Sequence, residues 1–383
     1  MYTLPEQFEQ FADARKQGFL TVKQWKEDGK NVVGTYCTFT PVELIMAAGA
    51  IQVGLCGTSE EPIADAEKVL PRNLCPLIKS SYGFAITDKC PYFYFADLVV
   101  GETTCDGKKK MYEYMSEIKD MHVMELPQKK TGEAAKALWK SEMYLLKEKL
   151  ETKFNVEITD EKLREIIRLK NRERVALKNF CELASLTPPA ISGVQMQKVL
   201  EGAMFKFDKE AFIAELDKMT ADLKAQWEKD NCHAVSPDAK RVLITGCPIG
   251  GAAAKVVTAI EESGGVVVGF ENCMGLKANW ELVDETKDPM EALSEKYLNI
   301  PCSVMMKNTG RLDLLDEMAA VTKAQGVVDV VLTACHTYNV ETGKIRDHVT
   351  GKQGLPYTTV ETDYSQSDIG QLKTRLGAFI EML

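Results

Sequence analysis

Apolar and polar residues form two kinds of pattern along the chain. One consists of short apolar runs, and the other consists of long amphipathic stretches. In the first part, the pattern predicts in chain order a helix over 1–30, a strand over 31–37, a helix over 41–50, a strand over 51–55, a further apolar run over 91–100 and a helix over 109–118. Strands that alternate with helices are typical of a mostly parallel sheet. We therefore expect an α/β domain over residues 1–131.

From residue 132 to 236 the sequence pattern is different, because charged stretches with helical periodicity replace the short apolar runs. These patterns cover 134–153, 160–186, 194–205 and 209–227. Leu163, Ile166 and Ile167 recur at the spacing of one helix face, which indicates amphipathic helices. We interpret 132–236 as a helical connecting region.

The strand-and-helix pattern returns over 237–383. It predicts strands over 241–247, 265–270, 327–335 and 356–360, and helices over 252–263 and 368–383. Residues 34–37 match 245–247 in position, and 99–105 match 330–335. This repeat of layout predicts two similar open parallel-sheet domains that face each other across a cleft.

The charge and composition narrow the class of protein. The 383 residues include 47 Lys and Arg against 56 Asp and Glu, a net charge of −9, which argues against a nucleic-acid binder. No apolar run approaches the roughly 20 residues that a membrane span needs. The N-terminal residues lack the basic and apolar regions of a signal peptide, so we expect a cytoplasmic protein.

The eleven cysteines are the unusual feature of the composition. Disulfides are rare in cytosolic proteins, so these thiols are buried small side chains, reactive groups or metal ligands. With four histidines in the chain, sulfur would supply most of the ligands of a metal. Thiolates favour iron–sulfur clusters or zinc.

Several cysteines stand where parallel strands are predicted to end. Five directly follow strand-like runs: Cys37, Cys105, Cys247, Cys273 and Cys335. Ligands bind at the carboxyl ends of the strands in open parallel sheets, so these thiols would converge in the cleft between the domains. Cys75, in the segment 73–76, lies in a loop that could reach the same place. Six candidates exceed the four ligands of a zinc site.

The other cysteines carry weaker signals. Cys90, before Pro91, is ambiguous between ligand and structural residue. The remaining four have the surroundings of ordinary cysteines: Cys56, Cys181, Cys232 and Cys302.

Acid–base candidates are fewer. His336 directly follows Cys335 and is a candidate proton donor, although a histidine that simply hydrogen-bonds a loop fits equally well. Glu102 is a second candidate acid; Lys79, Tyr338 and Glu361 are weaker ones. The run 108–110 of three lysines has the pattern of a solvated turn. The glycine-rich segment 246–251 could present backbone N–H groups to an anion, but it lacks the motifs of a nucleotide site.

Taken together, the segments 74–81, 105–110 and 335–336 resemble the cysteine segments of the 2-hydroxyacyl-CoA dehydratase family. The resemblance covers nearly the whole chain. With 34–37 and 245–251 added, the set is most similar to the double-cubane cluster proteins of that superfamily. The resemblance implies two α/β domains with iron–sulfur ligands in the cleft between them.

The two branches imply different clusters. In the dehydratases three cysteines hold one [4Fe–4S] cluster, and the matching positions are Cys75, Cys105 and Cys335. In the double-cubane branch two cubanes share a sulfide, [8Fe–9S], which leaves six irons for cysteine. The six thiols Cys37, Cys75, Cys105, Cys247, Cys273 and Cys335 match that number. Both branches receive electrons from a separate ATP-hydrolysing iron–sulfur activator, and the resemblance also implies a homodimer.

Three hypotheses follow. The first is a double-cubane enzyme that reduces a small molecule in the cleft, with His336 or Glu102 as proton donor. The second is the [4Fe–4S] subunit of a dehydratase that removes water from a CoA thioester. The third is a non-enzymatic electron-transfer or scaffold protein whose cysteines hold zinc or nothing.

Overall fold

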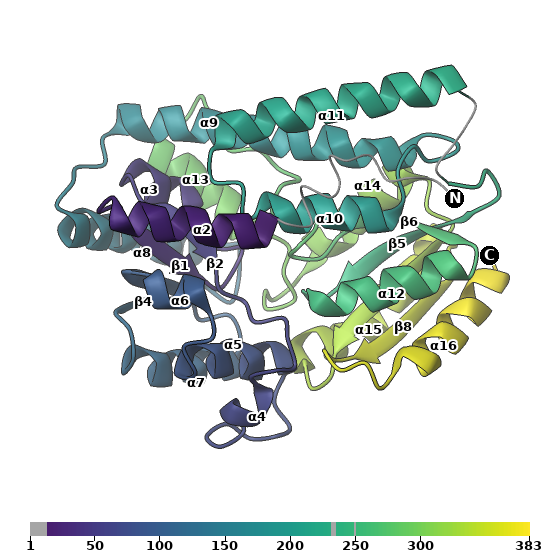
Figure 1. Cartoon of the computed structure of the whole chain (residues 1–383), viewed down its shortest axis with the longest axis horizontal. Helices are drawn as coiled ribbons and strands as arrows, with labels where there is room; N and C mark the ends of the chain where they lie inside the picture. Colours follow the sequence, from purple (N-terminus) through teal and green to yellow (C-terminus); the bar gives the residue numbers. More distant parts are fainter. Residues whose placement is uncertain (1–13, 231–234, 249) are drawn as a thin grey trace.

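The computed structural model describes residues 14–230, 235–248 and 250–383, and it contains two four-stranded sheets in which every pairing is parallel. The first sheet consists of β1 (Val32–Thr35), β2 (Ile51–Gly54), β3 (Leu98–Glu102) and β4 (Met121–Met124). The second consists of β5 (Lys240–Gly246), β6 (Gly265–Phe270), β7 (Gly326–Leu332) and β8 (Tyr357–Thr362). The α/β class with two open parallel sheets is thus confirmed (Figure 1).

Both sheets have the same strand order. It is β2-β1-β3-β4 in the first and β6-β5-β7-β8 in the second. The repeat seen in the sequence corresponds to this order, since 34–37 and 245–247 are the ends of β1 and β5, and 99–105 and 330–335 those of β3 and β7. The chain leaves these neighbouring strands in opposite directions across the sheet, which opens a crevice at their carboxyl ends.

Helices cover both sheets. Around the first lie α2 (Ala14–Glu27), α3 (Val42–Ala47), α4 (Ile63–Ala66), α5 (Pro76–Ile86), α6 (Pro91–Phe95) and α7 (Asp106–Ser116). Around the second lie α12 (Gly251–Glu262), α14 (Thr309–Thr322), α15 (His336–His348), the π-helical turn η2 (Val349–Gln353) and α16 (Ile369–Glu381). Helix α13 (Pro289–Leu298) follows β6 in the chain but packs against α8 and α9, beside α3 (Figure 1). The apolar run over 91–100 is not one strand, because Pro91 starts a helix at its first turn and β3 begins only at Leu98.

The middle of the chain is helical, as the amphipathic patterns predict. It contains α8 (Glu133–Phe154), α9 (Asp160–Glu182), the 3₁₀ turn η1 (Leu183–Ser185), α10 (Gly193–Ala203) and α11 (Lys209–Asp230). Helices α9 and α11 lie side by side along one side of the molecule (Figure 1). Helix α9 also contacts α3 and α13 beside the first sheet, and it continues into η1, which contacts β6 of the second sheet, so it spans both halves.

A buried polar contact joins these three parts. Arg174 on α9 donates from Nη2 to Oε1 of Glu43 on α3 at 2.5 Å. The hydroxyl of Tyr297, on α13, donates to the other oxygen of the same carboxylate at 2.7 Å. We refer to this set as the Glu43–Arg174–Tyr297 contact. Because all three side chains are buried, it fixes how the two halves sit against the helical region.

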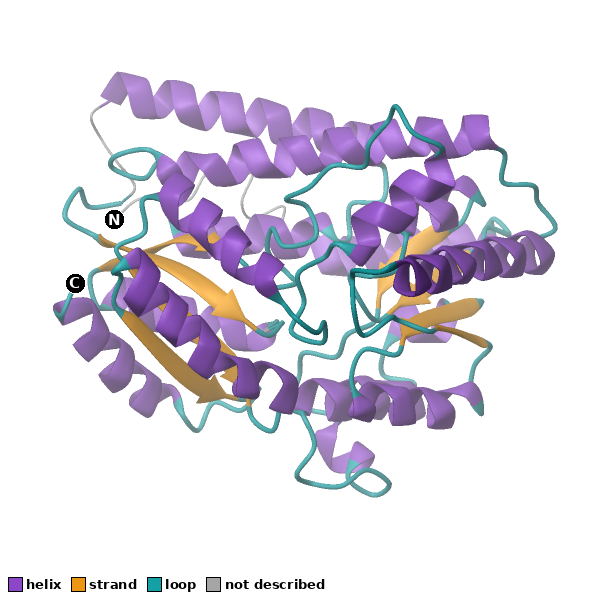
Figure 2. Ribbon diagram, turned by 180° about the vertical axis from the view of Figure 1, so that it is seen from behind, coloured by secondary structure: helices purple, strands orange, loops and turns teal. Residues whose placement is uncertain are grey.

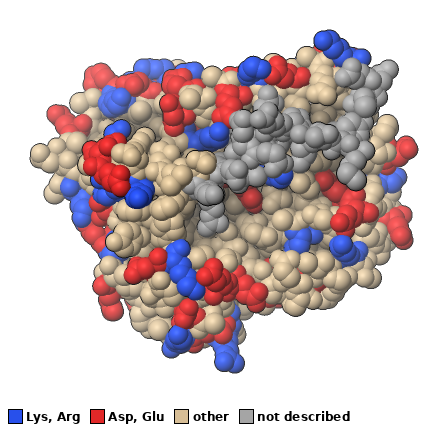
Figure 3. All heavy atoms as spheres, in the orientation of Figure 1, with Lys and Arg blue, Asp and Glu red and all other residues tan. Residues whose placement is uncertain are grey.

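Two further observations concern the molecule's surroundings. Within the described part of the chain, no helix combines the length and apolar character needed to cross a membrane. On the described part of the face seen in Figure 3, acidic and basic side chains intermingle and form no large patch of one sign.

Candidate functional site

The loops that follow the strands of both sheets meet in the middle of the molecule (Figure 2). The five strand-end cysteines belong to these loops. Cys37 comes two residues after β1, Cys105 three after β3, Cys247 one after β5, Cys273 three after β6 and Cys335 three after β7. Parallel pairing puts the carboxyl ends of the strands at one edge of each sheet, which explains why thiols so distant in sequence gather here.

Three thiols, Cys75, Cys247 and Cys335, interact directly. Cys335 is close enough to both others that each pair raises a thiol pKa, Cys75 through Cys335 and Cys335 through Cys247. The main cause is a hydrogen bond between the two thiols of each pair, followed by burial and by repulsion from the neighbouring sulfur, whereas the hydrogen bond with Cys75 lowers the pKa of Cys335. Cys247 is also held against the end of β7, because the backbone N–H of Leu332 donates to its sulfur at 2.9 Å. A cationic metal or cluster would remove this penalty by displacing the protons.

Helix starts present three of the predicted ligands. Cys75, Cys105 and Cys335 are the N-cap residues of α5, α7 and α15. Backbone N–H groups and the positive end of the helix dipole stabilise negative charge at such positions. The same geometry suits thiolates that carry the charge of a cluster.

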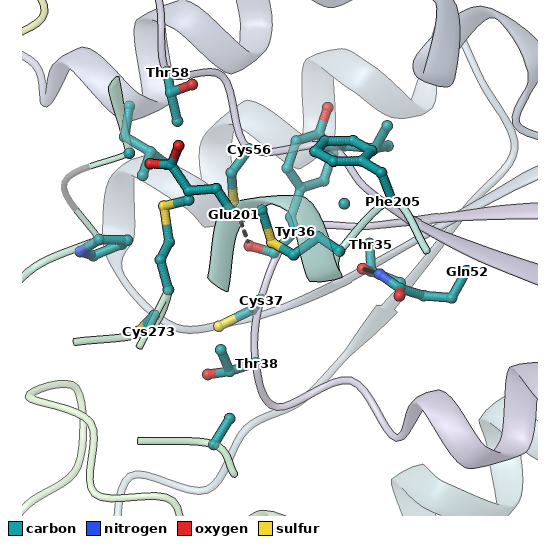
Figure 4. A pocket seen from close by; sticks show the side chains of 18 of the residues that line it. Thr35, Tyr36, Cys37, Thr38, Gln52, Cys56, Thr58, Glu201, Phe205 and Cys273 are labelled. Carbon is teal, nitrogen blue, oxygen red and sulfur yellow. Dashed lines mark hydrogen bonds between the residues drawn. The ribbon is translucent and has the colours of Figure 1, made fainter. Parts of the chain in front are cut away.

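Beside this group lies a pocket of about 720 Å³. Its wall comes from all three parts of the chain and includes the thiol residues Cys37, Cys56, Cys90 and Cys273. Figure 4 shows Cys37, Cys56 and Cys273 around the same hollow. The volume lies within the range of roughly 300–1,000 Å³ that is usual for small-molecule sites.

Two cysteines that the sequence analysis set aside belong to this neighbourhood. Cys56 follows β2 by two residues, and its sulfur donates to the carbonyl of Tyr36 at 3.1 Å. Cys56 is exposed in the pocket wall, and the pKa of its thiol is raised by desolvation inside the pocket first and also by Cys273 and Cys75. Cys302 has its sulfur 3.7 Å from the hydroxyl of Tyr338. Cys56 could have been predicted from the sequence, because it follows a strand as the other candidate ligands do. Cys302 could not, because it follows no strand.

A buried charged cluster supports the loop that carries Cys273. Lys277 donates to the hydroxyl of Tyr338 at 2.9 Å, and that hydroxyl lies 3.8 Å from the Cys273 sulfur. Lys277 also pairs with Glu271 at 3.0 Å, and Arg311 pairs with the same carboxylate at 3.4 Å. Tyr338 therefore acts as a link between a rigid charged network and two thiols.

Lys108 and Glu102 lie next to Cys37. Lys108 lines the pocket and donates from Nζ to the Tyr36 carbonyl at 2.7 Å. The expected solvated turn over 108–110 is wrong, because the three lysines lie in the first turns of α7, where Lys109 and Lys110 are exposed. Thr40 donates to Oε1 of Glu102, while Oε2 has no hydrogen-bond partner among the described residues. Burial raises the pKa of this carboxyl to about 7, against the opposing effects of Thr40 and Lys108.

The remaining candidates are spread out. His336 is exposed at the first position of α15 and is not part of the pocket wall. Lys79 forms a structural pair with Glu67 at 2.8 Å, and Glu361 is exposed at the surface. Gly250 and Gly251 pack directly against Thr58, so the glycine-rich segment closes the gap between the two halves. Cys232 and one residue of that segment, Ile249, lie outside the described residues.

The donor set fits an iron–sulfur cluster better than a single ion. Among the residues that the structure describes, no three His, Cys, Asp or Glu side chains form a site for one metal ion. The thiols are instead distributed around the edges of two sheets, which suits a group with many atoms and many attachment points. All of them are sulfur, the ligand type of iron–sulfur clusters.

Comparison with known proteins agrees with this chemistry. The family model described as 2-hydroxyglutaryl-CoA dehydratase, D-component, matches residues 37–383. The chain therefore belongs to this family of dehydratase subunits. The superfamily resemblance and the prediction of an enzyme subunit are confirmed.

Individual relatives cover almost the whole chain. The Escherichia coli (strain K12) protein named "Putative dehydratase subunit YjiM" is 59% identical over 380 residues, 99% of this chain and 98% of the relative. The (R)-phenyllactyl-CoA dehydratase beta subunit of Clostridium sporogenes is 25% identical over 94% of each chain. The beta subunit of (R)-2-hydroxyglutaryl-CoA dehydratase from Acidaminococcus fermentans is 22% identical, again over 94% of each chain.

Proposed function

We propose that this protein is an iron–sulfur enzyme that reduces a small molecule at an [8Fe–9S] double-cubane cluster held between its two sheets. The proposal rests on the number of cysteines that are expected at the facing ends of the strands. The sequence predicts six cysteines there: Cys37, Cys75, Cys105, Cys247, Cys273 and Cys335. A single [4Fe–4S] cluster needs at most four of them.

When bound, such a cluster supplies electrons at low potential, and a separate ATP-hydrolysing iron–sulfur activator delivers them. The chain's own residues hold the cluster and shape the pocket beside it. The helix starts at Cys75, Cys105 and Cys335 favour the negative charge of the cluster. A homodimer is the assembly that we propose for the chain.

Glu102 is our first candidate for the proton donor. A carboxyl with a pKa of about 7 is partly protonated at neutral pH, and its free Oε2 can hold the proton. Thr40, which donates to the other oxygen, lines the pocket and gives a short route to it. His336, exposed beside Cys335, is the second candidate.

The second candidate function is a dehydratase subunit with one [4Fe–4S] cluster. Its support is the names of the relatives, among them a phenyllactyl-CoA dehydratase beta subunit, and the shared helix-start position of Cys75, Cys105 and Cys335. In this case a second, different subunit would be required.

Iron and acid-labile sulfide per chain, measured on protein purified without oxygen, separate the alternatives. About eight irons with nine sulfides are expected for the double cubane, and about four of each for the dehydratase cluster. No iron after anaerobic purification and attempted reconstitution would refute both enzyme functions and favour the non-enzymatic hypothesis.

A pair of variants tests the ligand set. Cys335→Ala is expected to lose iron, because Cys335 lies at the centre of the interacting thiols. Cys181→Ala is the matched control, since Cys181 is buried in α9 and no other thiol influences its pKa. Equal iron contents in the two variants would show that the assignment is wrong.

A further inference from the structure

The lining of the pocket contains more positive than negative side chains. Its basic members are Lys108, Lys170, Arg174, Lys198 and Lys296, and Glu201 is its acidic member. Some of these cations have carboxylate partners elsewhere: Arg174 pairs with Glu43, and Lys170 pairs with Glu173. Lys296, in contrast, forms no ion pair with a carboxylate of the described residues.

The Lys296 amine is buried beside the pocket. It is 6% exposed, yet the described residues provide it with no ion pair. Its Nζ donates to the carbonyl of Ala278 at 2.7 Å and lies 4.3 Å from the ring centre of Tyr297. An ammonium has three N–H donors, and burying one with so few partners is costly. Ala278, Asn279 and Tyr297 all line the pocket around it.

We infer that Lys296 anchors the negatively charged oxygen group, a carboxylate or a phosphate, of the molecule that enters this pocket. An oxyanion there would take up the unused N–H donors and supply the missing counter-charge. The inference deepens the proposed function and rests on it only in calling that molecule the substrate.

The charged groups around Lys296 predict how ligand binding depends on pH. Burial, followed by the cations Arg174 and Lys170 of α9, lowers the pKa of Lys296 well below its ordinary value. Glu43 of α3 and Glu281 of the loop before α13 oppose this effect. An oxyanion beside the amine would raise its pKa again. Binding should therefore take up protons, and the affinity should fall as the pH rises.

Calorimetric titration of the anaerobically purified protein tests this with two probes, butyrate and inorganic phosphate. Saturable binding of butyrate alone would identify a carboxylate, binding of phosphate alone a phosphate, and binding of both the shared oxyanion chemistry. Proton uptake, measured in buffers of different ionisation enthalpy, and weaker binding as the pH rises are expected. No binding of either probe, or binding that is independent of pH, would overturn the inference.

Two variants test whether the binding of the probes depends on Lys296. Lys296→Met keeps the side-chain length without the charge, and it should weaken probe binding about tenfold or more. Lys287→Met is the control, because Lys287 forms an exposed pair with Glu295 outside the pocket. Equal affinity of wild type and Lys296→Met would refute the assignment. Iron analysis of the same preparations keeps the two proposals apart: anion binding without iron refutes the cluster alone, and iron without anion binding refutes the anchor alone.

Discussion

The Glu43–Arg174–Tyr297 contact gives the sharpest prediction about stability. Replacing Arg174 with Met leaves the Glu43 carboxylate, which is 0% exposed, without its cation. Removing one partner of a buried ion pair costs about 3–5 kcal/mol, because the other charge stays buried and uncompensated. The loss would also loosen α3 and α13 from α9.

The electrostatics of the pair give a magnitude of the same size. Burial disfavours the ionised Glu43, yet Arg174 and the cations beside it hold the pKa of this carboxyl at about 2, below its ordinary 4.5. With about 1.4 kcal/mol for each pH unit, this difference corresponds to about 3 kcal/mol. Because the pKa is lowered in the folded state, this stability is complete above pH 4.5 and is lost as the pH falls toward 2.

Urea unfolding followed by circular dichroism measures the effect. Arg172→Met is the control on the same helix, because Arg172 pairs with Glu210 at the surface and its loss should cost under about 1 kcal/mol. In the double variant Glu43→Gln with Arg174→Met, much of the lost stability should return, since no charge stays buried. A cost for Arg174→Met below about 1 kcal/mol, or no recovery in the double variant, would refute the reasoning.

Two further predictions concern the site and its support. Glu102→Gln should lower turnover by about 100-fold and abolish its decline as the pH rises through about 7, because the wild-type carboxyl loses its proton there; a pH–rate profile that Glu102→Gln leaves unchanged would exclude Glu102 as the acid. Gly246→Ala should reduce thermal stability strongly, since Gly246 has φ +120° and a Cβ would lie 2.0 Å from the Val330 carbonyl oxygen. Gly343→Ala, in open space within α15, should instead raise stability by roughly 0.5–1 kcal/mol, and equal melting temperatures for the two variants would contradict the argument.

Much of the fold could be predicted because the strands of a parallel sheet are apolar throughout. The runs at 241–247 and 265–270 correspond to β5 and β6 with nearly the expected bounds. Strand β4 went unpredicted because it is an edge strand with mixed exposure. The apolar run over 91–100 left the boundary between α6 and β3 undefined, because aromatic residues after a proline are found in buried helices as well as in strands.

The site residues that directly follow strands could be predicted from the sequence. Parallel pairing brings the ends of β1 and β3 together in the first sheet and the ends of β5 and β7 together in the second, whatever the intervening sequence. Contacts that arise from loop packing left no such signal. Cys302 reaches Tyr338 through a loop after α13, and Lys296 became a pocket residue only because α13 packs against α9.

The covalent continuity of the two sheets has a consequence for how a cluster would be loaded. Thiols from both sheets sit on one polypeptide, and α9 keeps the two layers in contact. Their effective concentration toward one another is therefore set by the fold and not by association between subunits. Reconstitution of a single chain with iron and sulfide should reach the same stoichiometry in dilute and concentrated protein.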